Sequence, residues 1–235
     1  MGSNPVRRLA SLLFAGGLAF LLLSLVATLD FGHPPMRVGS GILTEAPAQV
    51  GTANIVTAVV LAYRGIDTLG ELSILFAAAT AAGLVLGRPG RASSPPKPGG
   101  FVLRVGADLL LPLLVVIGLY IIAHGHLTPG GGFQGGVILA AAFFLPLLAS
   151  PGRGPGHAGL SVVEGLAGGG FILIGLLALW QEGAFLEPLL GTGELGSLLS
   201  GGTLPLLYLA VGLKVGAELS ALLARLMGEA HDAGD

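Results

Sequence analysis

Apolar residues occur along the chain in long runs, separated by short stretches that are polar or rich in glycine. A run of about 17 to 25 mostly apolar residues is long enough for an α-helix to cross a membrane. Six such runs are present, at residues 8–28, 69–87, 105–124, 134–150, 161–181 and 204–226. Lipid cannot hydrogen-bond an open strand edge, and no alternating strand pattern appears, so all six are predicted to be helices. The predicted fold is all-α, a polytopic transmembrane helix bundle.

One further apolar segment, residues 53–64, runs directly into the second of these stretches. A single helix over residues 53–87 would be about 50 Å long, whereas the apolar core of a bilayer is about 30 Å thick. Gly65 and Gly70 offer places for a break. We therefore expect a short interfacial or re-entrant helix before the true span. Irregular backbone should join the two and be buried against protein or water.

The composition excludes a soluble protein and several kinds of chemistry. Hydrophobic residues make up 53% of the 235 residues and charged residues 10%, and the mean hydropathy is +0.87. A net charge of −2 supplies no cationic field for nucleic acid, so the expected surroundings are lipid and other membrane proteins. The chain has no cysteine, which excludes an iron–sulfur cluster or cysteine-ligated zinc bound by this chain. Metal and iron–sulfur centres, if the function needs them, would belong to partner subunits.

The distribution of basic residues predicts the orientation. If the six spans alternate, most basic side chains fall on one side of the membrane, which should be the cytoplasm and should hold both termini. They are Arg7, Arg8, Arg88, Arg91, Lys97, Arg104, Arg153 and Arg225. The run at residues 8–28 ends without a convincing cleavage site, so we interpret it as a retained span rather than a signal peptide.

A stretch rich in proline, glycine and serine divides the chain. Residues 87–100, GRPGRASSPPKPGG, lack apolar periodicity and cannot be helical across their proline pairs. They predict a cytoplasmic linker over residues 89–100. The linker separates a two-span module at residues 1–88 from a four-span module at residues 101–235.

The first polar cluster, YRGIDTLGE at residues 63–71, places Arg64, Asp67 and Glu71 at three- and four-residue spacing near the start of a span. Such residues share a face if they are helical. Charges within apolar segments are tolerated mainly when they are paired or line a wet path. Arg64 could therefore form a structural ion pair with Asp67 or Glu71. Alternatively, Glu71 carries a proton or a cation.

The second polar cluster lies within the last span, where Lys214 and Glu218 stand four residues apart in VGLKVGAEL. They form either a fixed pair that pins the helix or part of a proton relay. Glu164, near the start of the fifth span, has no cationic partner close in sequence, which would suit a place at the membrane interface. Two glycine pairs on the last spans, Gly165 with Gly169 and Gly212 with Gly216, have the spacing that lets membrane helices approach closely.

The connection between the third and fourth spans, HGHLTPGGGFQGG at residues 124–136, permits tight backbone turns. His124 and His126 are candidates for proton entry, although two histidines without a third ligand more often lie at a surface or cap a helix. No metal site is predicted. No catalytic signature is recognisable, so the chain is not expected to be an enzyme by itself.

These motifs are familiar from membrane complexes that exchange ions. Residues 101–227, with HGHLTPGGGFQGG and VGLKVGAEL, resemble the MnhB/MrpB family, a small subunit of Mrp-type Na+/H+ antiporters that also occurs in energy-converting membrane-bound hydrogenases. Residues 52–87 look like the carboxy-terminal end of the large MrpA protein of those antiporters and like the matching MbhE-type hydrogenase subunit. The large antiporter domain that normally precedes this first module is missing here, and the two modules are fused.

The resemblance implies an accessory membrane subunit of a multisubunit cation/proton-translocating assembly in the cytoplasmic membrane of a bacterium or archaeon. Its partners would be antiporter-like subunits, the transported species Na+ or H+, and the chain itself would hold no cofactor. The resemblance carries over to Asp67, Glu71, Lys214 and the glycine-rich connection. The candidates for polar groups along or beside the ion path are Asp67, Glu71, Lys214 and Glu218, with Arg64 and Glu164 as further candidates. Two alternatives stay open: the membrane arm of an energy-converting hydrogenase or related oxidoreductase, and a scaffold whose charges are static pairs.

Overall fold

A computed structural model describes residues 5–28, 37–86, 99–150 and 156–232. Within these ranges the chain forms helices and no strands. The long helices are α1 (Pro5–Thr28), α4 (Gly65–Leu86), α5 (Phe101–Ala123), α6 (Gly132–Ala149), α7 (His157–Gln181) and α8 (Leu204–Asp232). Shorter elements lie between α1 and α4: α2 (Arg37–Val50), α3 (Ile55–Thr57) and the π-helical turn η1 (Ala58–Tyr63).

The six predicted spans are confirmed as helices. In the described residues, six helices are long and apolar enough to cross a membrane, and each begins and ends close to the predicted bounds. The chain is therefore a multi-pass membrane protein. Most of the predicted linker lies outside the described residues.

The chain divides into two compact units, Met1–Ser40 and Gly41–Asp235. The first unit contains the long helix α1. This division, between residues 40 and 41, does not coincide with the predicted boundary between the two sequence modules. The modules at residues 1–88 and 101–235, with the linker at 89–100, stay a prediction.

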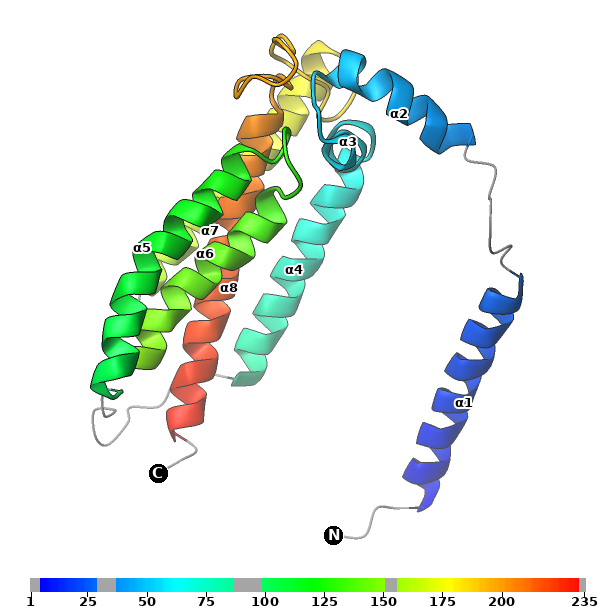
Figure 1. The fold of residues 1–235 in the computed structure, drawn as a ribbon. Helices are drawn as coiled ribbons and strands as arrows, with labels where there is room; N and C mark the ends of the chain where they lie inside the picture. The colour runs from blue at the N-terminus through cyan, green and yellow to red at the C-terminus, as the bar shows by residue number, and fades with distance from the viewer. Residues whose placement is uncertain (1–4, 29–36, 87–98, 151–155, 233–235) are drawn as a thin grey trace. The chain divides into compact units, whose positions relative to one another are not determined.

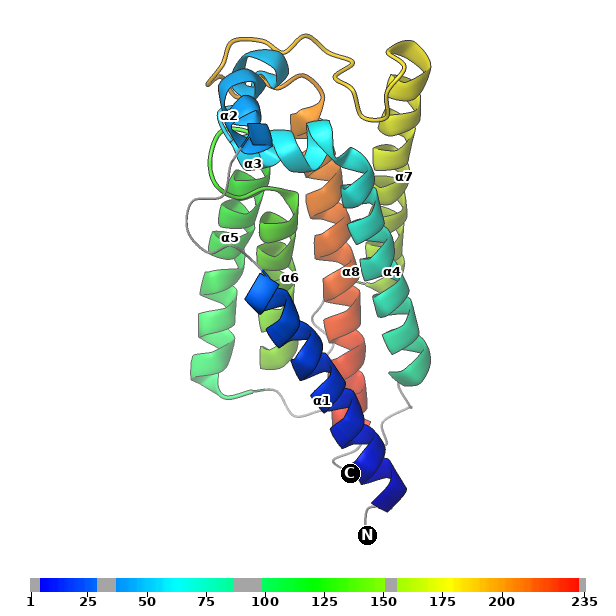
Figure 2. The ribbon, with the colours of Figure 1, turned by 90° about the vertical axis from the view of Figure 1, so that its right-hand side faces the viewer.

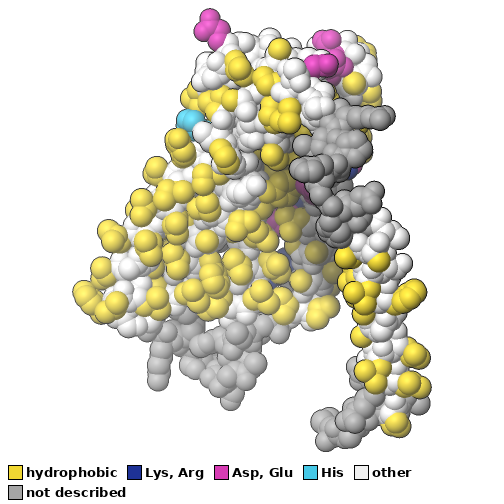
Figure 3. Space-filling model, turned by 45° about the vertical axis from the view of Figure 1, so that its right-hand side comes forward, with side chains coloured by type: hydrophobic (Ala, Val, Ile, Leu, Met, Phe, Trp, Pro, Cys, Tyr) yellow, Lys and Arg dark blue, Asp and Glu magenta, His cyan; other side chains and the backbone are white. Residues whose placement is uncertain are grey.

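The second unit is built around α8. Helices α4 to α8 run alternately up and down, and α8 contacts α4, α5, α6 and α7 (Figure 1). In the perpendicular view, α4 and α7 lie to one side of α8, and α5 and α6 to the other (Figure 2). Side chains of α8 such as Leu207, Val211 and Val215 are buried in the core, together with Phe171 of α7. Hydrophobic side chains also cover much of the outer face, as suits a protein surrounded by lipid or by other subunits (Figure 3).

Small residues let α6 and α8 touch backbone to backbone. A Cβ atom added at Gly136 would lie 2.8 Å from the carbonyl oxygen of Gly212. A Cβ added at Gly216 would lie 3.3 Å from the carbonyl oxygen of Gly136. The glycine pair on α8 is thus a packing surface, as its spacing predicts. The pair on α7 differs, because additions at Gly165 and Gly169 would meet nothing within 4 Å.

The segment before α4 is broken twice. The chain bends by 89° between α2 and the short helix at residues 55–63, and it breaks again at Arg64, whose φ and ψ are −129° and 37°. The Thr68 hydroxyl donates to the carbonyl oxygen of Val60 at 2.7 Å, which satisfies a backbone group left open where η1 ends. The predicted short helix before the true span is present. Helix α2 was not predicted, because its sequence RVGSGILTEAPAQV contains two glycines and Pro47.

Candidate functional site

A buried ion pair lies in the middle of α8. The ammonium of Lys214 donates to Oε2 of Glu218 at 2.7 Å, and the two side chains are 10% and 2% exposed. Lys214 is roughly ten residues from the start of α8, which places it about 15 Å along the helix axis and near the centre of a core about 30 Å thick. The four-residue spacing on one helix brings the two charges together.

Helices α7 and α4 each contribute one group to this pair. Glu164 of α7 places Oε1 4.0 Å from the Lys214 ammonium, and its side chain is 20% exposed. Phe76 of α4 lies with its ring centroid 5.3 Å from the same ammonium, within the range of a cation–π contact. One lysine therefore faces two carboxylates and an aromatic ring. We call Lys214, Glu164 and Glu218 the α8 charge cluster.

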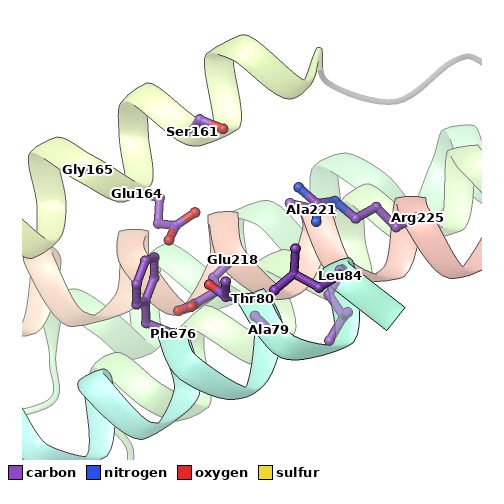
Figure 4. A pocket seen from close by; sticks show the side chains of 12 residues that line it. Phe76, Ala79, Thr80, Leu84, Ser161, Glu164, Gly165, Glu218, Ala221 and Arg225 are labelled. Carbon is purple, nitrogen blue, oxygen red and sulfur yellow. The ribbon is translucent and has the colours of Figure 1, made fainter. Parts of the chain in front are cut away.

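A cavity of about 510 Å³ adjoins this cluster between α4, α7 and α8 (Figure 4). Both carboxylates of the cluster line it, and in Figure 4 they are directed into the space between the helices. Thr80 and Ser161 add hydroxyl groups to the wall. Arg225, farther along α8, also lines the cavity, and its guanidinium lies against Gly83 of α4, where a side chain would collide with it.

Glu218 has an unsatisfied oxygen in this setting. Its Oε1 atom is buried and has no hydrogen-bond partner among the described residues, whereas Oε2 accepts from Lys214. An unpaired buried acceptor of this kind is costly, and it is normally satisfied by water or a bound ion. The site can therefore accept a further donor or a cation at Glu218.

The predicted charges at the start of α4 lie at a different place. Arg64 and Asp67 form an ion pair, and their side chains are 68% and 49% exposed. Glu71 is also exposed, and among the described residues it forms no ion pair. Arg64 lies in the break before α4 rather than on the helix. None of these three residues lines the cavity beside the α8 charge cluster, although α4 contacts α8.

The glycine-rich connection between α5 and α6 is held by the segment before η1. The Asn54 side chain donates to the carbonyl oxygens of Gly125 at 2.8 Å and Thr128 at 2.9 Å, while its own oxygen caps α3. The Thr57 hydroxyl donates to Gly125 as well, at 2.6 Å. Gly131 has a φ of +135°, and a Cβ there would lie 2.5 Å from Cε1 of Tyr208. The glycines therefore allow a close approach between loop and α8.

His124 and His126 occupy different surroundings in this connection. His124 places Nδ1 3.0 Å from the Tyr120 carbonyl oxygen and stacks on the Tyr120 ring, with 4.1 Å between centroids. His126 is fully buried, with Nε2 3.4 Å from the Ser197 carbonyl oxygen, and its Nδ1 has no partner in the described ranges of the chain. Burial lowers the pKa of His126 below its ordinary value. Burial thus favours the neutral form of this histidine.

Lys214, Glu218 and Glu164 were predicted from the sequence as candidate site residues. The residues that join them only through the packing of the helices were not predicted. No sequence motif marks the cavity or its lining residues Phe76, Thr80 and Ser161. Glu164 is 50 residues away from Lys214 along the chain, so its contact with the lysine could not be predicted from spacing. Among the described residues, no group of three or more histidine, cysteine, aspartate or glutamate side chains has the arrangement of a metal site.

Comparison with known proteins gives the family. The model of a domain related to the MnhB subunit of Na+/H+ antiporters matches residues 102–221. An uncharacterized protein of Methanocaldococcus jannaschii is 30% identical over 212 residues, covering 79% of this chain and 81% of that protein. A probable K(+)/H(+) antiporter subunit of Rhizobium meliloti is 25% identical over 173 residues. That match covers 63% of this chain, and the chain spans 17% of the length of the Rhizobium protein.

Two solved structures share the fold over nearly the whole chain. One chain of the membrane-bound sulfane sulfur reductase, an archaeal respiratory membrane complex, superposes with a TM-score of 0.79 and 38% identity. The match covers 94% of this chain and 98% of that chain. A chain of the Mrp complex from Dietzia superposes with a TM-score of 0.76 and 27% identity, covering 97% of this chain and 27% of that one. This chain accordingly belongs to the family of domains related to the MnhB subunit of Na+/H+ antiporters.

Proposed function

We propose that the chain is a non-catalytic membrane subunit of a multisubunit assembly that translocates cations and protons, and that the α8 charge cluster lies along or beside the ion path. Membership of the MnhB family and the similarity to the Mrp complex support the assembly. The partners would be other membrane subunits of that assembly, and Na+ or H+ would be the transported species.

The proposed ion path rests on one observation: the Lys214–Glu218 pair lies in the middle of a span. An ion pair buried at mid-membrane depth is rarely retained for stability, because well-packed apolar residues can replace such a pair at little or no loss. Ionisable groups within spans are characteristic of proton relays and ion pathways. Here the pair also adjoins a cavity large enough to hold water, which a purely structural pair does not need.

The driving reaction has a second candidate, supported by sequence identity. This chain is 38% identical to the sulfane sulfur reductase chain and 27% identical to the Mrp chain. The subunit would then transmit coupling inside a redox-driven membrane complex, with metal and iron–sulfur centres held by partner subunits. In both cases the chain itself would bind ions or protons and no redox cofactor.

The excess of basic residues on one side supports an orientation with the carboxy-terminal end of α8 and the amino-terminal end of α7 towards the cytoplasm. The cavity would then lie in the cytoplasmic half of the membrane, because it extends from Arg225 and Ser161 near those ends to Glu218 near the centre. We infer the cytoplasmic membrane of a bacterium or archaeon as the location.

To test the proposed function, the tagged chain is purified from its native membrane in mild detergent. The co-purifying subunits are then identified by mass spectrometry. Antiporter-like subunits alone would support an ion-gradient exchanger, and stoichiometric redox subunits would support the redox-driven complex. Recovery of the chain without membrane partners would refute both. Transport is then measured in inside-out vesicles for Glu218→Gln, with Glu194→Gln in an exposed loop as the matched control.

A further inference from the structure

We propose that the cavity between α4, α7 and α8 is a binding site for a monovalent cation, with Glu218 and Glu164 as its charged ligands and Lys214 as a built-in competitor for them. The inference rests on the proposed function and gives it a specific site in this chain. It follows from three features: an unpartnered buried oxygen, the net negative charge of the α8 charge cluster, and the position of the lysine between two carboxylates.

The first feature is Oε1 of Glu218. The residue is 2% exposed and lines the cavity, and within the described part of the chain no donor reaches this oxygen. Lys214 satisfies only the other oxygen. A cation in the cavity would supply the missing positive partner at the point where the protein itself supplies none.

The second feature is the charge of the α8 charge cluster. Two carboxylates and one ammonium give a formal charge of −1, which a monovalent cation neutralises. Arg225 lines the same cavity and brings the formal charge of these four side chains to zero, but its guanidinium lies against Gly83 of α4, and among the described residues it forms no ion pair with either carboxylate. The hydroxyls of Thr80 and Ser161 add neutral oxygen ligands to the wall. Divalent cations ordinarily require more oxygen ligands in a stricter arrangement than these residues provide.

The third feature is the position of Lys214 between two carboxylates. Its ammonium is 2.7 Å from Glu218 and 4.0 Å from Glu164, so it occupies the region in which a shared cation would sit. The Phe76 ring already lies 5.3 Å from the ammonium and adds a third contact to the lysine in this position. A bound cation and the lysine therefore compete for the same carboxylates. Removing the lysine charge should strengthen cation binding.

The test uses the absence of cysteine from this chain. Ala221→Cys places one thiol on the cavity wall, and Ala210→Cys places one in an apolar groove between α7 and α8 on the same helix. Inside-out vesicles holding the whole assembly are treated with a membrane-impermeant cationic methanethiosulfonate. Sodium, potassium or choline chloride is present at constant ionic strength. The chain is then isolated through its tag, and its modification is measured by mass.

We expect the thiol at position 221 to react and the thiol at 210 to stay unmodified. Saturating Na+ or K+ should slow the reaction at 221 at least fivefold relative to choline. Glu218→Gln, in the same background, should remove this protection, and Glu164→Gln provides a second variant should the first fail to assemble. Lys214→Met should give half-maximal protection at a cation concentration at least tenfold lower. Glu194→Gln should leave the protection unchanged.

Equal rates in Na+, K+ and choline, or no reaction at position 221, would overturn the inference. So would protection that persists in both glutamine variants. Such results would leave the proposed function intact if antiporter-like or redox subunits still co-purify, because subunit identity does not depend on this site. Loss of those partners would instead refute the proposed function.

Discussion

Replacing Gly136 by alanine should destabilise the protein, whereas the same replacement at Gly169 should not. Both glycines lie inside long helices, Gly136 on α6 and Gly169 on α7. A Cβ at Gly136 would lie 2.8 Å from the carbonyl oxygen of Gly212 and 2.8 Å from Cβ of Val215. A Cβ at Gly169 would meet nothing within 4 Å. The two variants therefore differ in packing and not in the chemical change.

Comparing Gly136→Ala with Gly169→Ala isolates the free-energy cost of overpacking. Alanine is preferred over glycine inside a helix by up to about 1 kcal/mol, and this gain applies to both positions. Overpacking at a tight contact costs about 1–3 kcal/mol. At Gly136 one of the atoms in the way is a backbone oxygen of α8, which moves only if the helices separate. We therefore expect the two variants to differ by about 3 kcal/mol, the upper end of that range, with Gly169→Ala at least as stable as the parent chain.

The assay is unfolding of the purified full chain in mild detergent by increasing mole fractions of a denaturing detergent, followed by circular dichroism. Equal midpoints for the two variants would refute the packing of α6 against α8 described above. For Gly169→Ala, the amount of partner subunits that co-purify with the chain is measured as well. If that variant is stable alone but loses partners, then the open glycine face of α7 is a subunit contact.

Four further predictions use the same or simple assays. Lys214→Met leaves Glu218 buried without its partner and should destabilise the chain by about 3–5 kcal/mol in the detergent assay, while the double change with Glu218→Leu should recover most of that loss. Asn54→Ala removes two side-chain hydrogen bonds to the glycine-rich connection and a helix cap, so a loss of about 2–4 kcal/mol is expected in that assay. Because burial lowers the pKa of His126, the unfolded chain binds this proton at a higher pH than the folded chain, and stability should fall as the pH drops below about 6.5. Unfolding midpoints between pH 7 and pH 5 check this, and His126→Gln should flatten the slope. Glu71→Gln should abolish coupled transport in vesicles while leaving the assembly intact, and normal transport would remove Glu71 from the path.

The spans were predictable because a bilayer imposes a strict rule on the sequence. A segment that crosses it must be long, apolar and helical, and each of the six predicted runs obeys this rule. Helix α2 was not predicted, because the requirement for a long apolar segment does not apply to it. It is 14 residues long and contains Pro47, so neither its length nor its composition distinguishes it from a loop.

The candidate site was predictable only where its residues are neighbours on one helix. The four-residue spacing of Lys214 and Glu218 indicates their contact directly. Glu164 and Phe76 reach the same ammonium from other helices, and their contacts depend on how α4 and α7 pack against α8. The opposite case is Arg64 with Asp67 and Glu71, where an equally clear spacing produces one exposed ion pair and an exposed acid.

The arrangement of α4 makes the two sequence modules depend on each other. Its residues Phe76 and Thr80 form one wall of a cavity whose other walls come from α7 and α8. Just before α4, Asn54 and Thr57 bind the loop that joins α5 to α6, so the same segment fixes both the position of α4 and the shape of that loop. Without the first module, Glu218 and Glu164 would face lipid or a partner protein instead of a walled cavity. Because exposure of ionisable groups to lipid is costly, a separate second module would need an equivalent helix from a partner before it could be stable.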